Sequence, residues 1–154
     1  MEIKLKPIGI IHSPFKKKED IESKKYADFR GFDSIQGELE IFKEYEKGLK
    51  DVEGFSHLVV LFAFHKSEGY KLHTKPLLGG ILRGVFATRS PNRPNPIGMT
   101  VVKVLERNRN RLKVSGVDMI EGTPILDIKP FTSRDQKSRI KLGWLKEKMN
   151  KQRA

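Results

Sequence analysis

Phe55-Ser56-His57-Leu58-Val59-Val60-Leu61-Phe62-Ala63-Phe64 is an almost continuously apolar stretch. A run of this length, rich in β-branched and aromatic residues, is typical of a strand that is buried on both faces. The sequence therefore predicts a central β-strand over residues 55–64, around which the rest of the fold is organised.

Shorter strand signals lie on both sides of this central run. Alternation of polar and apolar residues over 37–42 predicts a half-buried strand. Similar signals predict strands over 3–11, 82–88, 99–105, 111–119 and 124–128, and we expect the last two to pair as a hairpin through Ile120-Glu121-Gly122-Thr123. The charged segment 16–32 lacks periodicity and is expected to be a loop, and 43–49 is expected to be a short helix or turn.

Many short strands, with turns between them and little helix, predict a mostly-β protein, either a sandwich or a barrel. The family resemblance given below selects the barrel: small, closed or partly open, with short helices and a single domain. No glycine-rich phosphate-binding motif has the spacing of a doubly wound nucleotide-binding fold. We expect a barrel domain over 1–133 and a basic C-terminal extension over 134–154, packed on the barrel or trailing from it.

The charge balance points to a polyanionic partner. The 154 residues carry 31 lysines and arginines against 19 aspartates and glutamates, a net charge of +12. This excess suits RNA or DNA, and a role in solubility is the plain alternative. The absence of cysteine excludes disulfides and thiolate catalysis. No apolar run approaches the roughly 20 residues that cross a bilayer, and no signal peptide is recognised, so we expect a cytoplasmic protein.

The run Arg89-Ser90-Pro91-Asn92-Arg93-Pro94-Asn95-Pro96-Ile97-Gly98 predicts a stiffened loop. Its three prolines fix φ and restrict the residue before each of them. Two arginines on such a backbone would form a preorganised rim for an anionic or planar ligand.

Four histidines, His12, His57, His65 and His73, raise the alternative of a metal site. His57 and His65 on one strand would lie about 26 Å apart and could not share a metal, whereas His65 and His73 span a turn and could. His65 ends the central strand, where it could contact a ligand or cap the edge of the core. We expect His57, next to Ser56, to make a structural hydrogen bond.

The carboxylates Asp118, Glu121 and Asp127 surround Gly122-Thr123-Pro124. In the expected hairpin, Asp118 and Asp127 could approach each other and serve acid–base chemistry, so both are candidate catalytic bases. Gly-Thr-Pro is equally explained as turn chemistry, or its N–H groups could bind the edge of an adenine ring.

The basic segment near the C-terminus has two interpretations. It is either a solvated end that docks through Trp144 or an arm that contacts phosphates. Aromatic residues in or beside the basic N-terminal segment, such as Phe15 and Phe32, would suit unpaired bases.

Six blocks occur in a characteristic order, and the last of them ends in Asp127-Ile128-Lys129-Pro130. They span residues 8–15, 54–58, 84–90, 93–98, 118–119 and 122–130, with Arg-Pro-Asn-Pro-Ile-Gly at 93–98. Together they resemble the TsaA-like family, also called TrmO.

The resemblance implies a small β-barrel methyltransferase that uses S-adenosylmethionine and works as a homodimer. The reaction it implies is methylation at N6 of N6-threonylcarbamoyladenosine, next to the anticodon of a tRNA. It places the cofactor contacts on His65, Lys66, Arg89, Met99, Glu121, Gly122, Thr123 and Pro124. Lys66 and Glu121 stand where the family often has Gln and Asp, and the family's Pro-Arg-Gln contact has no match around Tyr26-Ala27-Asp28.

Substrate contacts are assigned to Arg93, Asn95 and Lys129. Arg89 and Arg93 could bind the threonyl carboxylate in a bidentate manner, with Arg93 the freer of the two to face the substrate. No metal is expected. The alternatives are a non-enzymatic β-barrel that binds RNA, and a metal-dependent hydrolase built on His65 and His73.

Overall fold

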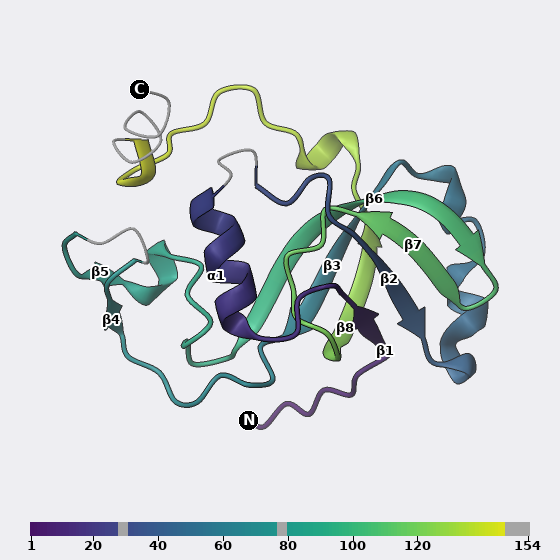
Figure 1. The fold of residues 1–154 in the computed structure, drawn as a ribbon, viewed down its shortest axis with the longest axis horizontal. Coiled ribbons are helices and arrows are strands. Elements are labelled where there is room, and N and C mark those ends of the chain that lie inside the picture. The colour runs from purple at the N-terminus through teal and green to yellow at the C-terminus, as the bar shows by residue number, and fades with distance from the viewer. Residues whose placement is uncertain (28–30, 77–79, 147–154) are drawn as a thin grey trace.

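The structure, a computed structural model, describes residues 1–27, 31–76 and 80–146. Its main feature is a closed barrel of antiparallel strands (Figure 1). Around the barrel the order is β1 (Gly9–His12), β2 (Gln36–Ile41), β7 (Arg111–Ser115), β6 (Ile97–Asn108), β3 (His57–Ala63) and β8 (Thr123–Pro130), which closes onto β1. The predicted mostly-β barrel is therefore confirmed, and it is closed.

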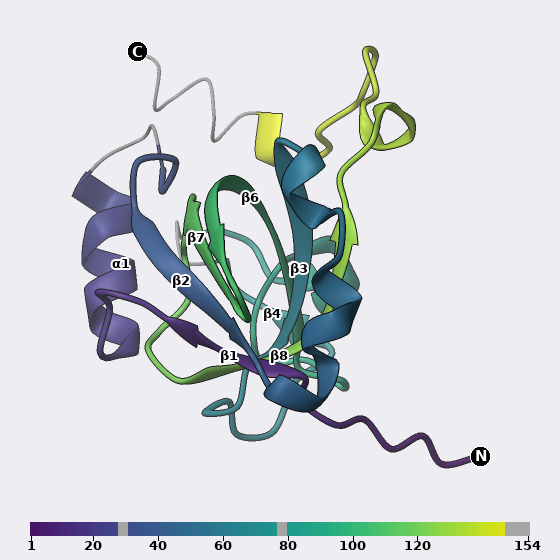
Figure 2. The ribbon, with the colours of Figure 1, turned by 90° about the vertical axis from the view of Figure 1, so that its right-hand side faces the viewer.

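The remaining elements surround the barrel. The helix α1 (Lys18–Ala27) lies on the side of β2, and the 3₁₀ helices η1 (Lys43–Leu49) and η2 (Val52–Gly54) lie on the side of β3 (Figure 2). A separate two-stranded sheet pairs β4 (His73–Thr74) with β5 (Arg83–Gly84). The short 3₁₀ helices η3 (Val85–Ala87) and η4 (Ser133–Asp135) complete the fold.

The interior of the barrel is filled by the alternating residues of its strands. From β3, Leu58, Val60 and Phe62 point into the core, while the residues between them are only half-buried. The predicted central strand is confirmed in position, but one of its faces is less buried than expected. The fully buried partners come from the other five strands and include Ile11, Leu39, Val102, Leu112, Val114 and Ile125.

Two predictions in the N-terminal part are corrected. The strand expected over 3–11 is only β1, because Gly9 pairs with Ile41 and the residues before Gly9 lie beyond the end of β2. The segment 16–32 contains α1. Asp20 marks its start by accepting the N–H groups of Lys16 and Lys17 at 3.0 and 3.2 Å, a local signal of helix initiation that the missing periodicity concealed.

Two predictions about strand pairing are also wrong. Residues 82–88 form only the short β5 and then η3, because β3 already has β6 and β8 on its two sides and offers no edge. The expected hairpin of 111–119 with 124–128 does not form, since β7 pairs with β2 and β6 whereas β8 pairs with β1 and β3. The hairpin partner of β7 is β6, through a turn in which Arg109 has a φ of 56°.

Candidate functional site

One end of the barrel gathers most of the residues expected to bind a ligand. At this end, which we call the site rim, β1, β3 and β7 finish and β2, β6 and β8 begin. His65 and Lys66 follow the end of β3, and Met99 lies near the start of β6. Because Phe62 pairs with Ile125, the chain that leaves β3 runs beside the turn that leads into β8. Segments far apart in sequence therefore meet at the site rim.

The proline-rich loop is fastened to the same rim. Phe64, just beyond β3, donates its N–H to the carbonyl of Pro96 at 2.8 Å. The hydroxyl of Ser67 lies 3.0 Å from the carbonyl oxygen of Pro91 and 2.6 Å from Oδ1 of Asn92. The loop is thus braced by contacts from outside as well as stiffened by its prolines.

The two arginines of this loop have different surroundings. Arg93 turns back on the loop, and its Nη1 donates to the carbonyls of Thr88 and Ser90 at 3.0 and 3.2 Å. Arg89 is exposed, and no hydrogen bond or ion pair of its side chain is found within the described part of the chain. The expectation that Arg93 is the freer of the two is therefore wrong, because among the described residues Arg89 is the free guanidinium and Arg93 braces the loop.

His65 and Met99 present two further side chains at the rim. Both are exposed, and Met99 has 46% of its surface open on the outer face of β6. Partial burial, together with the positive charge of Lys66, holds the pKa of His65 below its usual 6.5. A neutral imidazole and an apolar thioether at one rim suit an uncharged ring of a ligand better than they suit an anion.

The turn that precedes β8 uses its own N–H groups. Glu121 donates to the carbonyl of Phe15 at 2.7 Å, and Gly122 donates to that of Ile11 at 2.9 Å. Thr123 directs both its N–H and its hydroxyl to the carbonyl of Ile120, at 3.2 and 2.7 Å. The proposal that these N–H groups bind an adenine edge is therefore corrected, and only acceptor atoms of the turn remain for a ligand.

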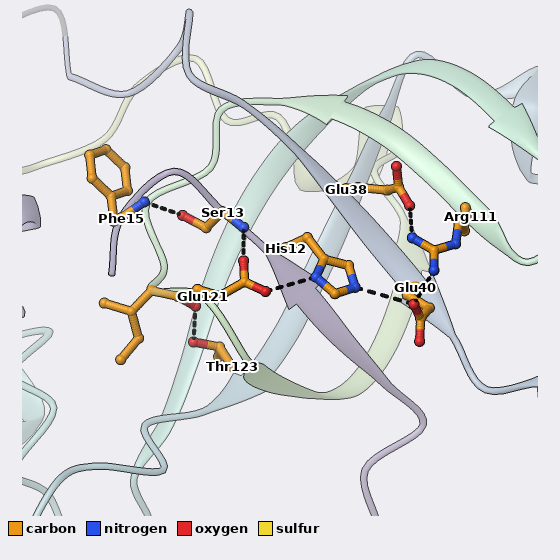
Figure 3. A network of polar contacts seen from close by, with 9 residues as sticks. His12, Ser13, Phe15, Glu38, Glu40, Arg111, Glu121 and Thr123 are labelled. Carbon is orange, nitrogen blue, oxygen red and sulfur yellow. Dashed lines mark hydrogen bonds and ion pairs between the residues drawn. The ribbon is translucent and has the colours of Figure 1, made fainter. Parts of the chain in front are cut away.

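The carboxylate of Glu121 is held by groups of β1 and the residue after it. Its Oε1 lies 2.8 Å from Nδ1 of His12, and its Oε2 accepts the N–H of Ser13 at 2.7 Å (Figure 3). His12 was considered above only as a metal candidate, because a contact across 109 positions of sequence leaves no local pattern. In this structure Glu121 fixes the turn to β1, and we call His12, Ser13 and Glu121 the rim clamp.

Alternating charges extend from the rim clamp across two more strands. His12 also contacts Glu40 of β2 through Nε2 at 3.2 Å. Arg111 of β7 reaches the same carboxylate oxygen and that of Glu38, each at 2.6 Å (Figure 3). The chain of charges thus joins β7, β2 and β1 to the turn before β8.

These contacts shift the pKa values of the clamp in opposite directions. Burial alone lowers the pKa of His12, but the hydrogen bonds and charges of Glu121 and Glu40 outweigh it and raise the pKa above 6.5. For Glu121, burial raises the pKa. The hydrogen bonds from the N–H of Ser13 and from His12, together with the charges of His12 and Lys16, outweigh burial and lower the pKa below 4.5. Below pH 6.5 an imidazolium therefore faces two carboxylates.

The candidate bases Asp118 and Asp127 do not face each other in a hairpin. The hydroxyl of Thr100, on β6, donates to Asp118 at 2.6 Å, while Asp127 lies on β8 and binds Lys129 at 2.8 Å. Because β3 stands between β6 and β8, these two carboxylates belong to different parts of the barrel wall. Lys129 is about 20 Å from Thr123 along β8, so the structure does not bring it to the site rim.

The other sequence-based candidates fall outside the rim. Among the described residues, no group of three or more His, Asp or Glu side chains could hold a metal ion. His57 contacts the hydroxyl of Ser56 at 2.8 Å, which confirms its structural hydrogen bond. Phe15 is buried and packs edge-on against Phe32, so it cannot stack on a base.

Across the described ranges, no helix is long and apolar enough to cross a membrane.

The fold is a small, closed antiparallel β-barrel whose rim gathers most of the residues expected to bind a ligand. Residues 10–136 match the tRNA-methyltransferase O N-terminal domain. The chain therefore belongs to the TrmO family, as the six sequence blocks indicated.

Relatives and solved structures agree with this membership. A probable S-adenosyl-L-methionine-binding protein of Pyrococcus abyssi is 43% identical over 95% of this chain and 78% of its own length. The tRNA (adenine(37)-N6)-methyltransferase of Escherichia coli is 40% identical over 80% of this chain and 55% of its own length. The crystal structure of TrmO from Pseudomonas aeruginosa superposes with a TM-score of 0.74 at 33% identity, covering 94% of this chain and 63% of that one. The chain thus spans only part of the methyltransferases that it resembles.

Proposed function

We propose that this protein transfers a methyl group from S-adenosylmethionine to N6 of adenosine 37 in tRNA, within the cytoplasm. The observation that carries the proposal is the site rim, where the chain after β3 with His65, the start of β6 with Met99 and the turn before β8 meet, and where the loop that begins at Arg89 is fastened. The names of the relatives, which include S-adenosyl-L-methionine-binding proteins and tRNA (adenine(37)-N6)-methyltransferases, support it.

The residues of the rim fit this cofactor in their chemistry. Met99 and the neutral imidazole of His65 suit the adenine ring, while the unpaired guanidinium of Arg89 suits the carboxylate of the methionyl group. Lys66, Gly122, Thr123 and Pro124 remain neighbours of the bound molecule, through backbone and apolar contacts. Glu121 acts differently from the expectation, because its carboxylate is already occupied by the rim clamp.

When bound, the cofactor supplies a methyl group on a sulfonium, which an in-line nucleophile can displace. The protein contributes alignment and exclusion of water, which account for much of the acceleration of such a transfer. The rigid loop around Arg89 and the clamped turn at Glu121 fix two walls of the site before substrate arrives. Of the candidate bases, Asp118 is the better placed, because it is bonded to Thr100, next to Met99 near the start of β6, whereas Asp127 lies four residues into β8.

The substrate that we propose is N6-threonylcarbamoyladenosine. Its threonyl carboxylate is an anion that an arginine can bind in a bidentate manner, which unmodified adenosine lacks. Arg93 and Asn95 lie on the braced loop next to this position, and Arg93 acts through the shape of the loop because its Nη1 is engaged. The division into a barrel over 1–133 and an extension over 134–154 is part of the same proposal.

We also propose that the protein works as a homodimer. The outer face of β6 carries an exposed apolar row made of Ile97, Met99, Val101 and Leu105. Apolar rows on an outer strand face favour a protein contact. A second copy on this row would cover Met99 and supply the wall that a single barrel leaves open. The substitution Val101→Lys should then yield monomers in light scattering.

Calorimetric titration with S-adenosylmethionine and mass spectrometry of tRNA nucleosides test the proposed reaction. We expect micromolar binding, and methyl transfer to tRNA that carries the threonylcarbamoyl group but not to unmodified tRNA. Arg89→Ala should weaken cofactor binding by about tenfold, the loss of one good charge-assisted contact. Lys47→Ala, an exposed cation on η1 at the opposite end of the barrel, is the matched control. Absence of both binding and transfer in the native chain would refute the proposal.

A further inference from the structure

The described part of the C-terminal extension, residues 134–146, is a line of exposed cations. Its one acidic residue, Asp135, is occupied locally, since it accepts the N–H and the hydroxyl of Thr132 at 2.8 and 3.3 Å. The positive charge of the segment is therefore not balanced by its own carboxylates. The exposed cationic side chains are Arg134, Lys137, Arg139, Lys141 and Lys146.

Trp144 fastens this segment to the part of the molecule that carries Arg89. The indole Nε1 donates to the carbonyl of Ala87 at 2.8 Å, and the guanidinium of Arg83 lies 5.6 Å from the ring centroid. Ala87 ends η3, two residues before Arg89. Figure 1 shows the segment crossing from η4 to the sheet that contains β5. The end of the segment at Trp144 is therefore held next to η3, just before the proline-rich loop.

Exposed aromatic rings lie in the same region. Phe86, which precedes the docking point of Trp144, has 75% of its surface exposed, and Tyr70 has 56%. Aromatic rings interleaved with cations are the surface that unpaired bases of RNA recognise by stacking, while the phosphates meet the cations. The surface thus offers both kinds of contact beside the candidate site.

We propose that residues 134–146, docked through Trp144, form with Phe86 an RNA-contacting arm that holds the nucleotides around the methylated adenosine. This inference rests on the proposed function and adds the surface by which the tRNA is held. We favour RNA over a second copy of the chain as the partner that binds this arm. A partner with the same net charge of +12 would repel the arm, whereas phosphates neutralise it.

A pair of double variants with equal loss of charge tests the arm. Arg139→Gln with Lys141→Gln removes two cations from the arm, and Lys43→Gln with Lys47→Gln removes two exposed cations from η1 at the far end of the barrel. Binding of tRNA is measured by fluorescence anisotropy between about 50 and 200 mM salt. A plot of the logarithm of the binding constant against the logarithm of the salt concentration has a negative slope. The arm variant should make this slope shallower by about one to two, because each lost phosphate contact removes nearly one unit. The control variant should keep the native slope.

Intrinsic fluorescence gives a second readout, because Trp144 is the only tryptophan of the chain. We expect tRNA to change its emission, and Phe86→Ala to raise the KM for tRNA while the Kd for S-adenosylmethionine stays unchanged. Equal salt slopes in the two double variants, or an emission that saturating tRNA does not move, would overturn the arm. So would an arm variant that dissociates into monomers but binds tRNA normally. If the native chain methylates no tRNA, the proposed function fails, and the salt slopes still decide the arm.

Discussion

Replacing His12 by glutamine should destabilise the protein at mildly acidic pH, and the effect should fade as the pH rises. The imidazole contacts Glu121 at 2.8 Å and Glu40 at 3.2 Å, with 37% of the side chain exposed. At this exposure, solvent screening limits each pair to about 0.2–1 kcal/mol. We therefore expect His12→Gln to lower the free energy of unfolding by about 1 kcal/mol in total near pH 6.

The sign of the pH dependence follows from the two pKa shifts. The pKa of His12 is raised above 6.5, so its stabilisation is complete below that value and is lost as the pH rises through the raised pKa. The pKa of Glu121 is lowered below 4.5, so its stabilisation is present above that value and is lost in stronger acid. The rim clamp should contribute most between these two limits, at about pH 4.5 to 6.5.

Urea unfolding of the native protein and of His12→Gln at about pH 6 and about pH 9 measures the effect. Urea is uncharged and does not screen the ion pairs, and groups common to both proteins cancel in the difference. His73→Gln is the control, because His73 is exposed on β4 and makes no ion pair with any described residue. A destabilisation by His12→Gln that is as large at high pH as near pH 6 would refute the charged clamp.

Four further substitutions probe the loop and the barrel wall. Gly98→Ala would place a methyl group against a buried phenylalanine ring of β3, so urea unfolding should show a loss of about 1–3 kcal/mol. Arg93→Lys should raise the rate of proteolysis within the proline-rich loop, because lysine cannot reproduce both carbonyl contacts. Arg89→Lys should leave that rate unchanged and weaken only the binding of S-adenosylmethionine. Thr100→Val should remove the hydroxyl bond to Asp118 and cost about 1 kcal/mol in unfolding, with little change in cofactor affinity.

Local sequence patterns were sufficient for the strands that build the barrel core. The alternation over 37–42 matches β2, in which Leu39 and Ile41 are buried. The central run matches β3 because its apolar, β-branched residues have no other stable arrangement in a chain of this size. The apolar residues over 82–88 failed to form a barrel strand for a global reason, because a closed barrel leaves no position for a seventh strand.

The candidate site was less accessible to sequence reasoning. Motif resemblance pointed to His65, Arg89 and the turn at 121–124. Strand pairing brings the chain at His65 and this turn to one rim, and Ser67 fastens the loop of Arg89 there. The rim clamp was missed because His12 and Glu121 are distant in sequence and meet only through the pairing of β1 with β8. The engagement of Arg93 with its own loop was missed as well, since it depends on which guanidinium can reach the carbonyls of that loop.

Closure of the barrel also limits how copies of this protein can meet. Each of the six described barrel strands has a hydrogen-bonded neighbour on both sides, so none of them is an edge strand. Association through the barrel wall then depends on side-chain contacts, which single substitutions can change one at a time. Such a protein can gain or lose a partner on its wall during evolution without exposing the backbone edges that lead other β-proteins to aggregate.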